Sequence, residues 1–504
     1  MRKAHEAGSV FILYRTGFFR FTGDPLGRSL FLEKGKIGGN MMTDILNQID
    51  GLVWGPWLLV LLVGTGVLLT CRLSLLQVLK LPRALKLIFF ARNKGDGDID
   101  SFKALCTALA ATVGTGNIVG VATAIKLGGP GALFWMWLAA FFGMATKYAE
   151  GCLAVKYRGV DDQGNIAGGP MYYIEMGLGK KWKPLAVAFA IFGIMTAMLG
   201  SGTTTQMNAI TASVQAGFGV STYITCAVIT ILVAIITFGG LKSISKTASK
   251  IVPAMAVVYF IVTVIFLGLN AGELPHAIAL VIDGAFNGTA AAGGFAGAGV
   301  MLVLRSGIAR GLYSNESGLG SAPIVAAAAK TKWPAEQGLI SMTGTFIDTI
   351  IICTMTGLTI IVSGQWLGEL NGAELTQAAF ATTYGVFAPF LLTISLTLFA
   401  FTTIIGWNYY GERCWEYLFG TKTIPVYRVC YIAVLASAVF LKLEAIWALA
   451  DIVNGLMAIP NLIALLGLSG VIVSETKKYF GHLEIRDARL AAYKERRIGK
   501  KAEV

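Results

Sequence analysis

Long apolar stretches separated by short polar segments dominate this chain. A transmembrane helix needs about 20 predominantly apolar residues. Eleven segments approach or exceed that length: residues 52–70, 104–125, 131–155, 184–204, 222–240, 251–269, 295–326, 338–362, 387–411, 427–443 and 446–473. The pattern predicts an all-α, polytopic membrane protein with about eleven transmembrane helices.

Lysine and arginine concentrate in every second segment between these spans. The basic segments are 71–103, 156–183, 241–250, 327–337, 412–428 and the tail after 473. Neither residue occurs in 205–221, 270–294 and 363–386. Because short basic loops stay in the cytoplasm, the alternation predicts an external N-terminus and a cytoplasmic C-terminus. The expected location is the inner (plasma) membrane of the cell.

Composition agrees with lipid as the solvent for much of the surface. Of 504 residues, 55% are hydrophobic and 14% charged, against about 25% charged in soluble domains. The net charge of +13 resides in loops and the tail, which argues against a nucleic-acid partner because no basic stripe with interleaved aromatics occurs. The seven cysteines are scattered singly and form no CxxC pair, so we expect no structural metal site and no cofactor.

Hydropathy divides the chain into three parts. Residues 1–44 form an N-terminal extension of mixed polarity that lacks the features of a signal peptide. Met41 and Met42 directly precede the first strong apolar run, so an alternative start of translation lies there. Residues 45–474 are the predicted transmembrane domain, and residues 475–504 are a basic cytoplasmic tail.

Two predicted spans are interrupted by glycine and polar residues. The second span contains Gly114 and Gly116, and the seventh contains Gly318 and Gly320. Because five spans separate the two motifs, they cross the membrane in opposite directions, which indicates an inverted-repeat transporter. At such a break, helix N-termini can bind a carboxylate and free carbonyls a cation. The alternative is that these glycines only allow close helix packing.

Several long motifs resemble one family of membrane proteins. The stretch GGPGALFWMWLAAFFG at 128–143 is similar to the signature of the sodium:alanine (alanine/glycine:cation) symporter family. Further similar segments are ATVGTGNIVGVA (111–122), AGGPMYYIEMGLG (167–179), LYSNESGLGSAP (312–323) and FAFTTIIGWNYYGER (399–413). The resemblance extends from about residue 45 to about residue 474.

The resemblance implies a fold and a function. The fold would be that of the bacterial leucine transporter, with inverted five-helix repeats at about 104–269 and 295–473. The function would be sodium-coupled import of a small neutral amino acid, alanine or glycine. The ligands would be that amino acid and sodium, within a lipid bilayer. A proton-coupled carrier, or a glutamine-type carrier of the same fold, is the alternative.

By the same likeness, the first break would bind the substrate. The amides of Thr115 and Gly116 would hold the carboxylate, and Asn117 would brace the break or line the site. Sodium would bind the carbonyls and hydroxyls of four residues: Ala110, Val113, Thr402 and Thr403. Oxygen ligands suit a hard cation. Alternatively, the two threonine hydroxyls bond back to their own helix.

Two further polar or aromatic side chains are candidates for the substrate site. Trp407 lies four residues beyond Thr403 on the same helix face, where it could close the pocket on a small side chain. Gln206 lies near the outer end of the fourth span and could either reach the substrate or cap a helix.

Charged residues within spans need partners. Arg305, Arg310 and Asp348 are candidates for an ion pair, and Lys147 and Glu150 for a second pair or for snorkelling. Glu316 lies in the second break and is a candidate gate or helix-terminus partner.

Functions other than transport lack their sequence signatures. An intramembrane enzyme would need a nucleophile and base or metal ligands within the spans, and none of the three histidines lies securely in one. HExxH, GxSxG and P-loop motifs are absent from the sequence. A receptor would be expected to carry a soluble signalling domain, whereas an ion channel remains compatible with the topology.

Overall fold

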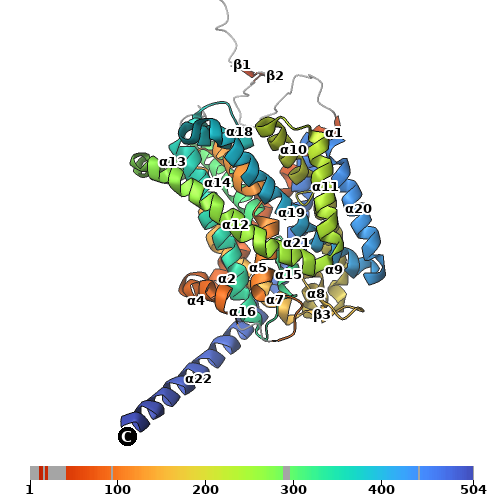
Figure 1. Ribbon diagram of the computed structural model, residues 1–504, viewed down its shortest axis with the longest axis vertical. Coiled ribbons are helices and arrows are strands. Elements are labelled where there is room, and N and C mark those ends of the chain that lie inside the picture. The colour runs from red at the N-terminus through yellow and green to blue at the C-terminus, as the bar shows by residue number, and fades with distance from the viewer. Residues whose placement is uncertain are drawn as a thin grey trace, which may run out of the picture.

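The computed structural model describes residues 11–14, 17–20, 41–91, 95–287, 296–440 and 443–502. Most of these residues are helical (Figure 1). The helices of the first half are α1 (Met41–Val53), α2 (Pro56–Arg72), α3 (Leu76–Leu79), α4 (Leu81–Phe90), α5 (Ser101–Thr112), α6 (Val121–Gly128), α7 (Gly131–Lys156), α8 (Pro170–Tyr173), α9 (Lys183–Leu199), α10 (Thr204–Phe218), α11 (Thr222–Phe238) and α12 (Gly240–Leu269).

The second half of the chain is also mainly helical. Its helices are α13 (Leu274–Asn287), α14 (Ala296–Asn315), α15 (Ala322–Ala326), α16 (Pro334–Thr345), α17 (Thr354–Val362), α18 (Gly372–Tyr384), α19 (Ala388–Phe419), α20 (Ile424–Ser437), α21 (Leu443–Gly467) and α22 (Ser469–Ala502). Two antiparallel hairpins add the strands β1 (Phe11–Tyr14), β2 (Gly17–Arg20), β3 (Gly159–Val160) and β4 (Ile166–Ala167).

Several helical segments of the described chain are long and apolar enough to cross a bilayer. Six qualify: Lys180–Phe218, Gly240–Leu269, Pro334–Val362, Gly372–Phe419, Thr421–Phe440 and Trp447–Gly467. A seventh is the pair Ser101–Thr112 and Gly116–Gly128, which is bent by 53°. The expectation of a helical protein with several apolar spans is thus confirmed, whereas the count of eleven exceeds what this criterion identifies.

Three segments expected to be loops are helical. Helix α10 occupies most of 205–221, and α13 and α18 each occupy slightly more than half of 270–294 and 363–386. Hydropathy missed them because they are not apolar all round, and a one-sided helix can still bury that side against neighbours. Helices α10 and α18 both pack against α19. In addition, α12 begins at Gly240, so the basic segment 241–250 is part of a helix.

The outer surface of the bundle carries large apolar side chains. On α11 and α12 these include Ile231, Ile235, Val257 and Ile261, each at least half exposed. Contiguous exposed apolar surface of this kind would be unfavourable in water and is expected where helices face lipid tails.

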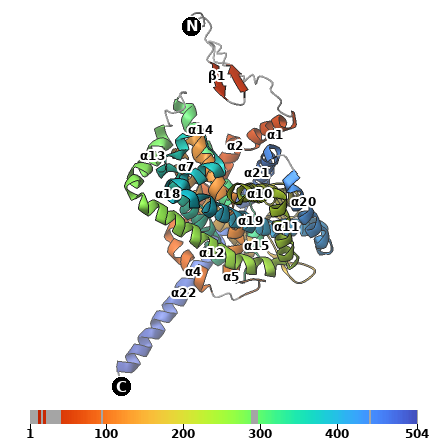
Figure 2. The same ribbon diagram turned by 45° about the horizontal axis from the view of Figure 1, so that its top comes forward.

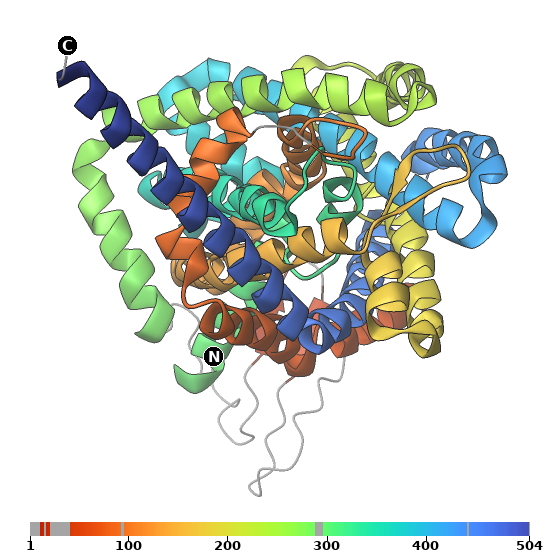
Figure 3. The same ribbon diagram turned by 90° about the horizontal axis from the view of Figure 1, so that it is seen from below.

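The interior is built around α7 and α19. Helix α7 packs along α14 and α16, while α19 packs along α9, α10 and α5. Helix α22 extends away from the bundle (Figures 1 and 2) and, seen from below, crosses its lower face (Figure 3). The two interrupted segments, between α5 and α6 and between α14 and α15, meet this interior.

Close helix contacts depend on individual glycines. A β-carbon added to Gly131, the first residue of α7, would lie 2.2 Å from the carbonyl carbon of Gly284 in α13. A β-carbon added to Gly64 of α2 would meet nothing within 4 Å.

We therefore expect Gly131→Val to lower the free energy of unfolding by about 1–3 kcal/mol, because the α13 backbone must move to admit the side chain. Thermal unfolding of the purified protein measures the effect, with Gly64→Val as the matched control. Equal melting temperatures for the two variants would contradict the close contact between α7 and α13.

Candidate functional site

The first interrupted segment leaves the helical path at Val113, whose ψ of 91° ends α5. In a continuous helix the Gly114 amide would donate to the carbonyl of Ala110. Here it donates to the Asn117 side-chain oxygen at 2.9 Å. The chain then forms a π-helical turn, Gly116–Gly120, before α6 begins. The break therefore releases the Ala110 carbonyl from its usual helical donor, in a fully buried position.

Helix α19 lies directly against this break. A β-carbon on Gly114 would come within 2.4 Å of the Thr403 hydroxyl, so only glycine allows this approach. The Thr403 hydroxyl oxygen is 3.5 Å from the Val113 carbonyl oxygen and donates to Phe399 O at 3.0 Å. A hydroxyl that donates its proton keeps its lone pairs for a cation. The Thr403 hydroxyl and the carbonyls of Val113 and Phe399 thus form an oxygen-rich cluster.

The neighbouring threonine faces elsewhere. The Thr402 hydroxyl donates to Phe399 O at 2.9 Å and lies 3.6 Å from the sulfur of Met255 in α12. Both hydroxyls therefore bond back to their own helix, which was the alternative considered from the sequence. Of the two, Thr403 is the one that the structure brings against the first break.

Gln206 reaches the first break from α10. Its side-chain oxygen accepts a long hydrogen bond from the Thr115 amide at 3.4 Å. Its Nε2 donates to the Thr115 hydroxyl at 3.1 Å and to Ser201 O at 3.0 Å. The contact is fully buried. Gln206 thus places a polar acceptor at one of the two amides expected to hold a carboxylate.

Asp348 connects the two interrupted segments. It lies in a π-helical stretch between α16 and α17. One carboxylate oxygen accepts from Asn117 Nδ2 at 2.7 Å. The other accepts from the hydroxyls of Ser314 at 2.9 Å and Thr349 at 2.8 Å. Since Asn117 belongs to the first break and Ser314 to the end of α14, one buried carboxylate bridges both.

The expected pairing of Asp348 with an arginine of α14 is wrong. Neutral donors occupy both oxygens of Asp348, and Arg310 points instead to Asp451 of α21, with a nitrogen–oxygen distance of 3.5 Å. Arg305 is exposed on the outer part of α14.

The second break lies at residues 316–321. Glu316 adopts a left-handed conformation (φ 55°), which is rare for a residue other than glycine. Its side chain is buried and accepts a hydrogen bond from Trp407 Nε1 at 3.0 Å and another from the Ser321 hydroxyl. These contacts join the break to α19 and to the beginning of α15.

Two charged residues of α7 hold the second break from the other side. Lys147 donates to the carbonyls of Asn315 and Glu316 at 3.0 and 3.1 Å. A Glu150 oxygen accepts from the amides of Gly318 and Gly320 at 3.1 and 3.2 Å. Asn461 of α21 donates to the same carboxylate oxygen at 2.7 Å.

The expectation that Lys147 and Glu150 pair with each other or snorkel is therefore corrected, because each is buried and engages the broken backbone. The positive charge of Lys147 also complements the partial negative charge of the carbonyls at the end of α14. The negative charge of Glu150 complements the partial positive charge of the amides that follow. Their sequence signal was two charges three residues apart in an apolar helix.

A cavity of about 200 Å³ adjoins the first break. Thr115 and Gly116 line it, together with the Arg310–Asp451 pair. Two aromatic side chains, Tyr313 and Trp447, line this cavity. Trp407 does not line it and is buried at the second break. Sequence reasoning missed Tyr313, Trp447 and Asp451. Aromatic and acidic residues within apolar helices were the available signal, but the helix face could not be inferred without the packing.

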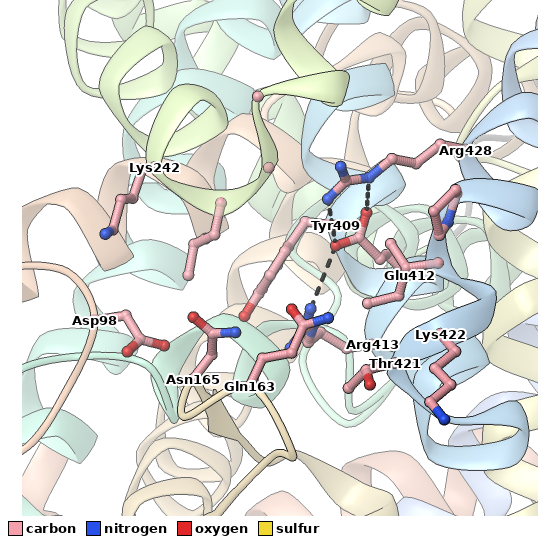
Figure 4. A pocket seen from close by; sticks show the side chains of 15 residues that line it. Asp98, Gln163, Asn165, Lys242, Tyr409, Glu412, Arg413, Thr421, Lys422 and Arg428 are labelled. Atoms are coloured by element: carbon pink, nitrogen blue, oxygen red, sulfur yellow. Dashed lines mark hydrogen bonds and ion pairs between the residues drawn. The ribbon is translucent and has the colours of Figure 1, made fainter.

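A larger cavity of about 440 Å³ lies between the β3–β4 hairpin, α12 and the end of α19 (Figure 4). Glu412 pairs with Arg428 at 2.7 Å, and Arg413 reaches Glu416 at 2.6 Å and Asp161 at 3.3 Å. The Arg413–Asp161 pair ties the hairpin to α19, and the Glu412–Arg428 pair ties α19 to α20.

The hairpin carboxylate is also held by its own loop. Burial alone would raise the pKa of Asp161, but hydrogen bonds from Asn165 and Gln163 and the charge of Arg413 outweigh burial. The pKa is therefore lowered below its ordinary value. The ionised form, which the pair with Arg413 requires, is favoured.

Comparisons with known proteins agree on a family. Residues 39–491 match the sodium:alanine symporter family. An uncharacterised transporter of Haemophilus influenzae is 56% identical over 88% of this chain and 97% of its own length. The sodium/alanine symporter AgcS of Methanococcus maripaludis is 50% identical over 86% and 96%. The probable sodium/glutamine symporter GlnT of Bacillus subtilis is 39% identical over 87% and 91%. The chain therefore belongs to the sodium:alanine symporter family, a family of multi-pass membrane transporters.

Proposed function

We propose that this transporter imports a small neutral amino acid, alanine or glycine, together with sodium. The observation that carries the proposal is the first break. Its Thr115 and Gly116 line a cavity of about 200 Å³, the Ala110 carbonyl lacks its usual helical donor, and the Thr403 hydroxyl lies 3.5 Å from the Val113 carbonyl oxygen. The amides offer donors for a carboxylate, and the oxygens offer ligands for a hard cation. A site with both amide donors and oxygen ligands fits a zwitterionic amino acid together with a monovalent cation.

The proposed binding mode assigns roles to the residues of the break. The amides of Thr115 and Gly116 bind the substrate carboxylate, which replaces the Gln206 oxygen at the Thr115 amide. Sodium binds the carbonyls of Ala110 and Val113 and the hydroxyl of Thr403, whereas Thr402, whose hydroxyl faces Met255, is not assigned to the site. Asn117 braces the break through its bond to the Gly114 amide.

Transport requires that this site open alternately to the two sides. On the proposed route the substrate enters past the Arg310–Asp451 pair, which lines the substrate cavity. It leaves toward the cavity at the end of α19, where the Arg413–Asp161 pair ties the hairpin to α19. Glu316 and Trp407 connect the second break to α19, so a movement of either reaches the other.

The membrane arrangement in the proposal follows hydropathy and charge. Eleven spans would place the N-terminus outside and the C-terminus in the cytoplasm of the inner (plasma) membrane. The transmembrane domain would be 45–474, with inverted repeats at about 104–269 and 295–473, an N-terminal extension at 1–44 and a cytoplasmic tail at 475–504. The buried breaks in α5–α6 and α14–α15, one in each repeat, support this division.

A glutamine carrier is the second candidate. It is favoured by the relative GlnT, whose name gives glutamine as a substrate. Proton coupling in place of sodium is the other variant, for which the buried carboxyl groups of Asp348 and Glu316 would be the relay.

Uptake of labelled alanine into proteoliposomes tests the proposal. We expect an inward sodium gradient to drive accumulation, and unlabelled glycine, alanine of either hand or serine to compete more effectively than glutamine. Uptake that ignores sodium but follows a proton gradient would establish the proton-coupled variant. Stronger competition by glutamine than by alanine would establish the second candidate.

Substitutions of the paired threonines test the sodium site. We expect Thr403→Val to raise the sodium concentration for half-maximal uptake by about tenfold or more, because losing a polar contact to a charge costs about 1.5–3 kcal/mol. Thr403→Ser retains the hydroxyl and should preserve sodium affinity. Thr402→Val, whose hydroxyl faces Met255, should have a smaller effect. Unchanged sodium dependence in Thr403→Val would remove this residue from the site.

Asp348→Asn tests the link between the two breaks. The substitution replaces an acceptor oxygen by a donor that must face the existing donors of Asn117, Ser314 or Thr349. We expect the maximal uptake rate to fall by about tenfold or more, since leaving such groups unpaired costs about 1–3 kcal/mol. The folded fraction is measured in parallel by size-exclusion chromatography. Normal sodium-driven uptake by a folded Asp348→Asn protein would contradict the proposed bridge.

A further inference from the structure

A cavity of about 430 Å³ lies remote from both breaks, where α4, the beginning of α16 and residues 479–486 of α22 converge. Its charged lining consists of one acid, Glu336, and four lysines or arginines, namely Arg83, Lys86, Lys332 and Arg486. Three separate elements contribute these cations. A cavity with this excess of positive charge is suited to an anionic group.

Specific contacts between aromatic and charged side chains hold the walls of this basic cavity together. The ring of Trp333 lies over His482, with centroids 4.8 Å apart, and the Tyr479 hydroxyl donates to Glu336 at 3.4 Å. Lys80 lies 4.9 Å from the ring centre of Phe480, which attaches the beginning of α4 to α22. The cavity is thus formed by packed elements and does not depend on one mobile side chain.

Phe90 lines the cavity, and exposed apolar side chains flank its α4 cations along the chain. At the end of α4, Phe89 and Phe90 are 75% and 71% exposed. The preceding turns expose Leu75, Val78 and Leu79 as well. Exposed phenylalanine and leucine beside lysine and arginine on short helices are typical of segments that lie at the boundary between lipid headgroups and acyl chains.

We propose that this cavity binds the headgroup of an anionic membrane phospholipid, with the acyl chains against an apolar rim of exposed side chains, namely Leu75, Val78, Leu79, Phe89 and Phe90. The cations select a net negative headgroup, because the ammonium group of a zwitterionic lipid would meet like charges. The rim selects a lipid over a free anion, because a soluble phosphate gains nothing from exposed phenylalanines. Basic cavities between helices at the membrane surface are known to recognise anionic headgroups.

Such a lipid would join α4, α16 and α22 at the point where the tail leaves the bundle. The inference requires membrane insertion but neither a particular substrate nor sodium coupling. Its failure and the failure of the proposed transport function can therefore be told apart.

Native mass spectrometry of the purified full chain in detergent tests the proposal, with phosphatidylglycerol, phosphatidylcholine and inorganic phosphate as probes. We expect retention of phosphatidylglycerol over phosphatidylcholine. Lys86→Gln/Lys332→Gln should weaken phosphatidylglycerol binding by about tenfold, since each basic residue near an anionic surface contributes substantially. The matched control is Lys180→Gln/Lys181→Gln, which removes the same charge from exposed lysines elsewhere and should bind as the unaltered protein does.

The apolar rim has its own test. Phe89→Ser/Phe90→Ser should weaken phosphatidylglycerol binding while leaving all four cations in place. Equal lipid retention by Lys86→Gln/Lys332→Gln and its control would overturn the site. Displacement of phosphatidylglycerol by equimolar inorganic phosphate would overturn the choice of a lipid and indicate a soluble-anion site.

Discussion

Backbone groups that leave a helix inside an apolar interior must find new hydrogen-bond partners, and the architecture of this transporter follows from that requirement. Each unpaired group in such surroundings would cost several kcal/mol. At the first break the partner is Asn117 of the same segment, whereas at the second break neighbouring helices supply Lys147, Glu150 and Asn461. Helices α7 and α21 are packed where they can deliver the last three side chains.

The two breaks are connected as well as individually satisfied. Asp348 accepts from the first break and from the end of α14, and Trp407 of α19 donates to Glu316 in the second. A polar network that loses some of its hydrogen bonds is costly in a low-dielectric interior. When the backbone moves at one break, a matching movement at the other break is therefore favoured. Such a network provides a physical basis for concerted movement around a shared site.

Sequence reasoning reached the features that depend on local residues. Glycines flanked by small polar residues in apolar runs predicted both interrupted segments, and long motifs predicted the family. It missed features that depend on which face of a helix meets which neighbour. Arg310 pairs with Asp451, more than a hundred residues away, and Trp447 rather than Trp407 lines the cavity. Helices α10, α13 and α18 escaped the hydropathy pattern because only one side of each is covered by the bundle.

The contact between Gln206 and Thr115 has a consequence for the empty carrier. A transporter that returns without cargo must move its recognition groups through an apolar environment, where bare donors would oppose the movement. In the proposed binding mode, the Gln206 side-chain amide takes the place of the substrate carboxylate at the Thr115 amide and removes that penalty. On that proposal the substrate enters by exchange with Gln206, and the carrier resets without an unpaired Thr115 amide in the protein interior.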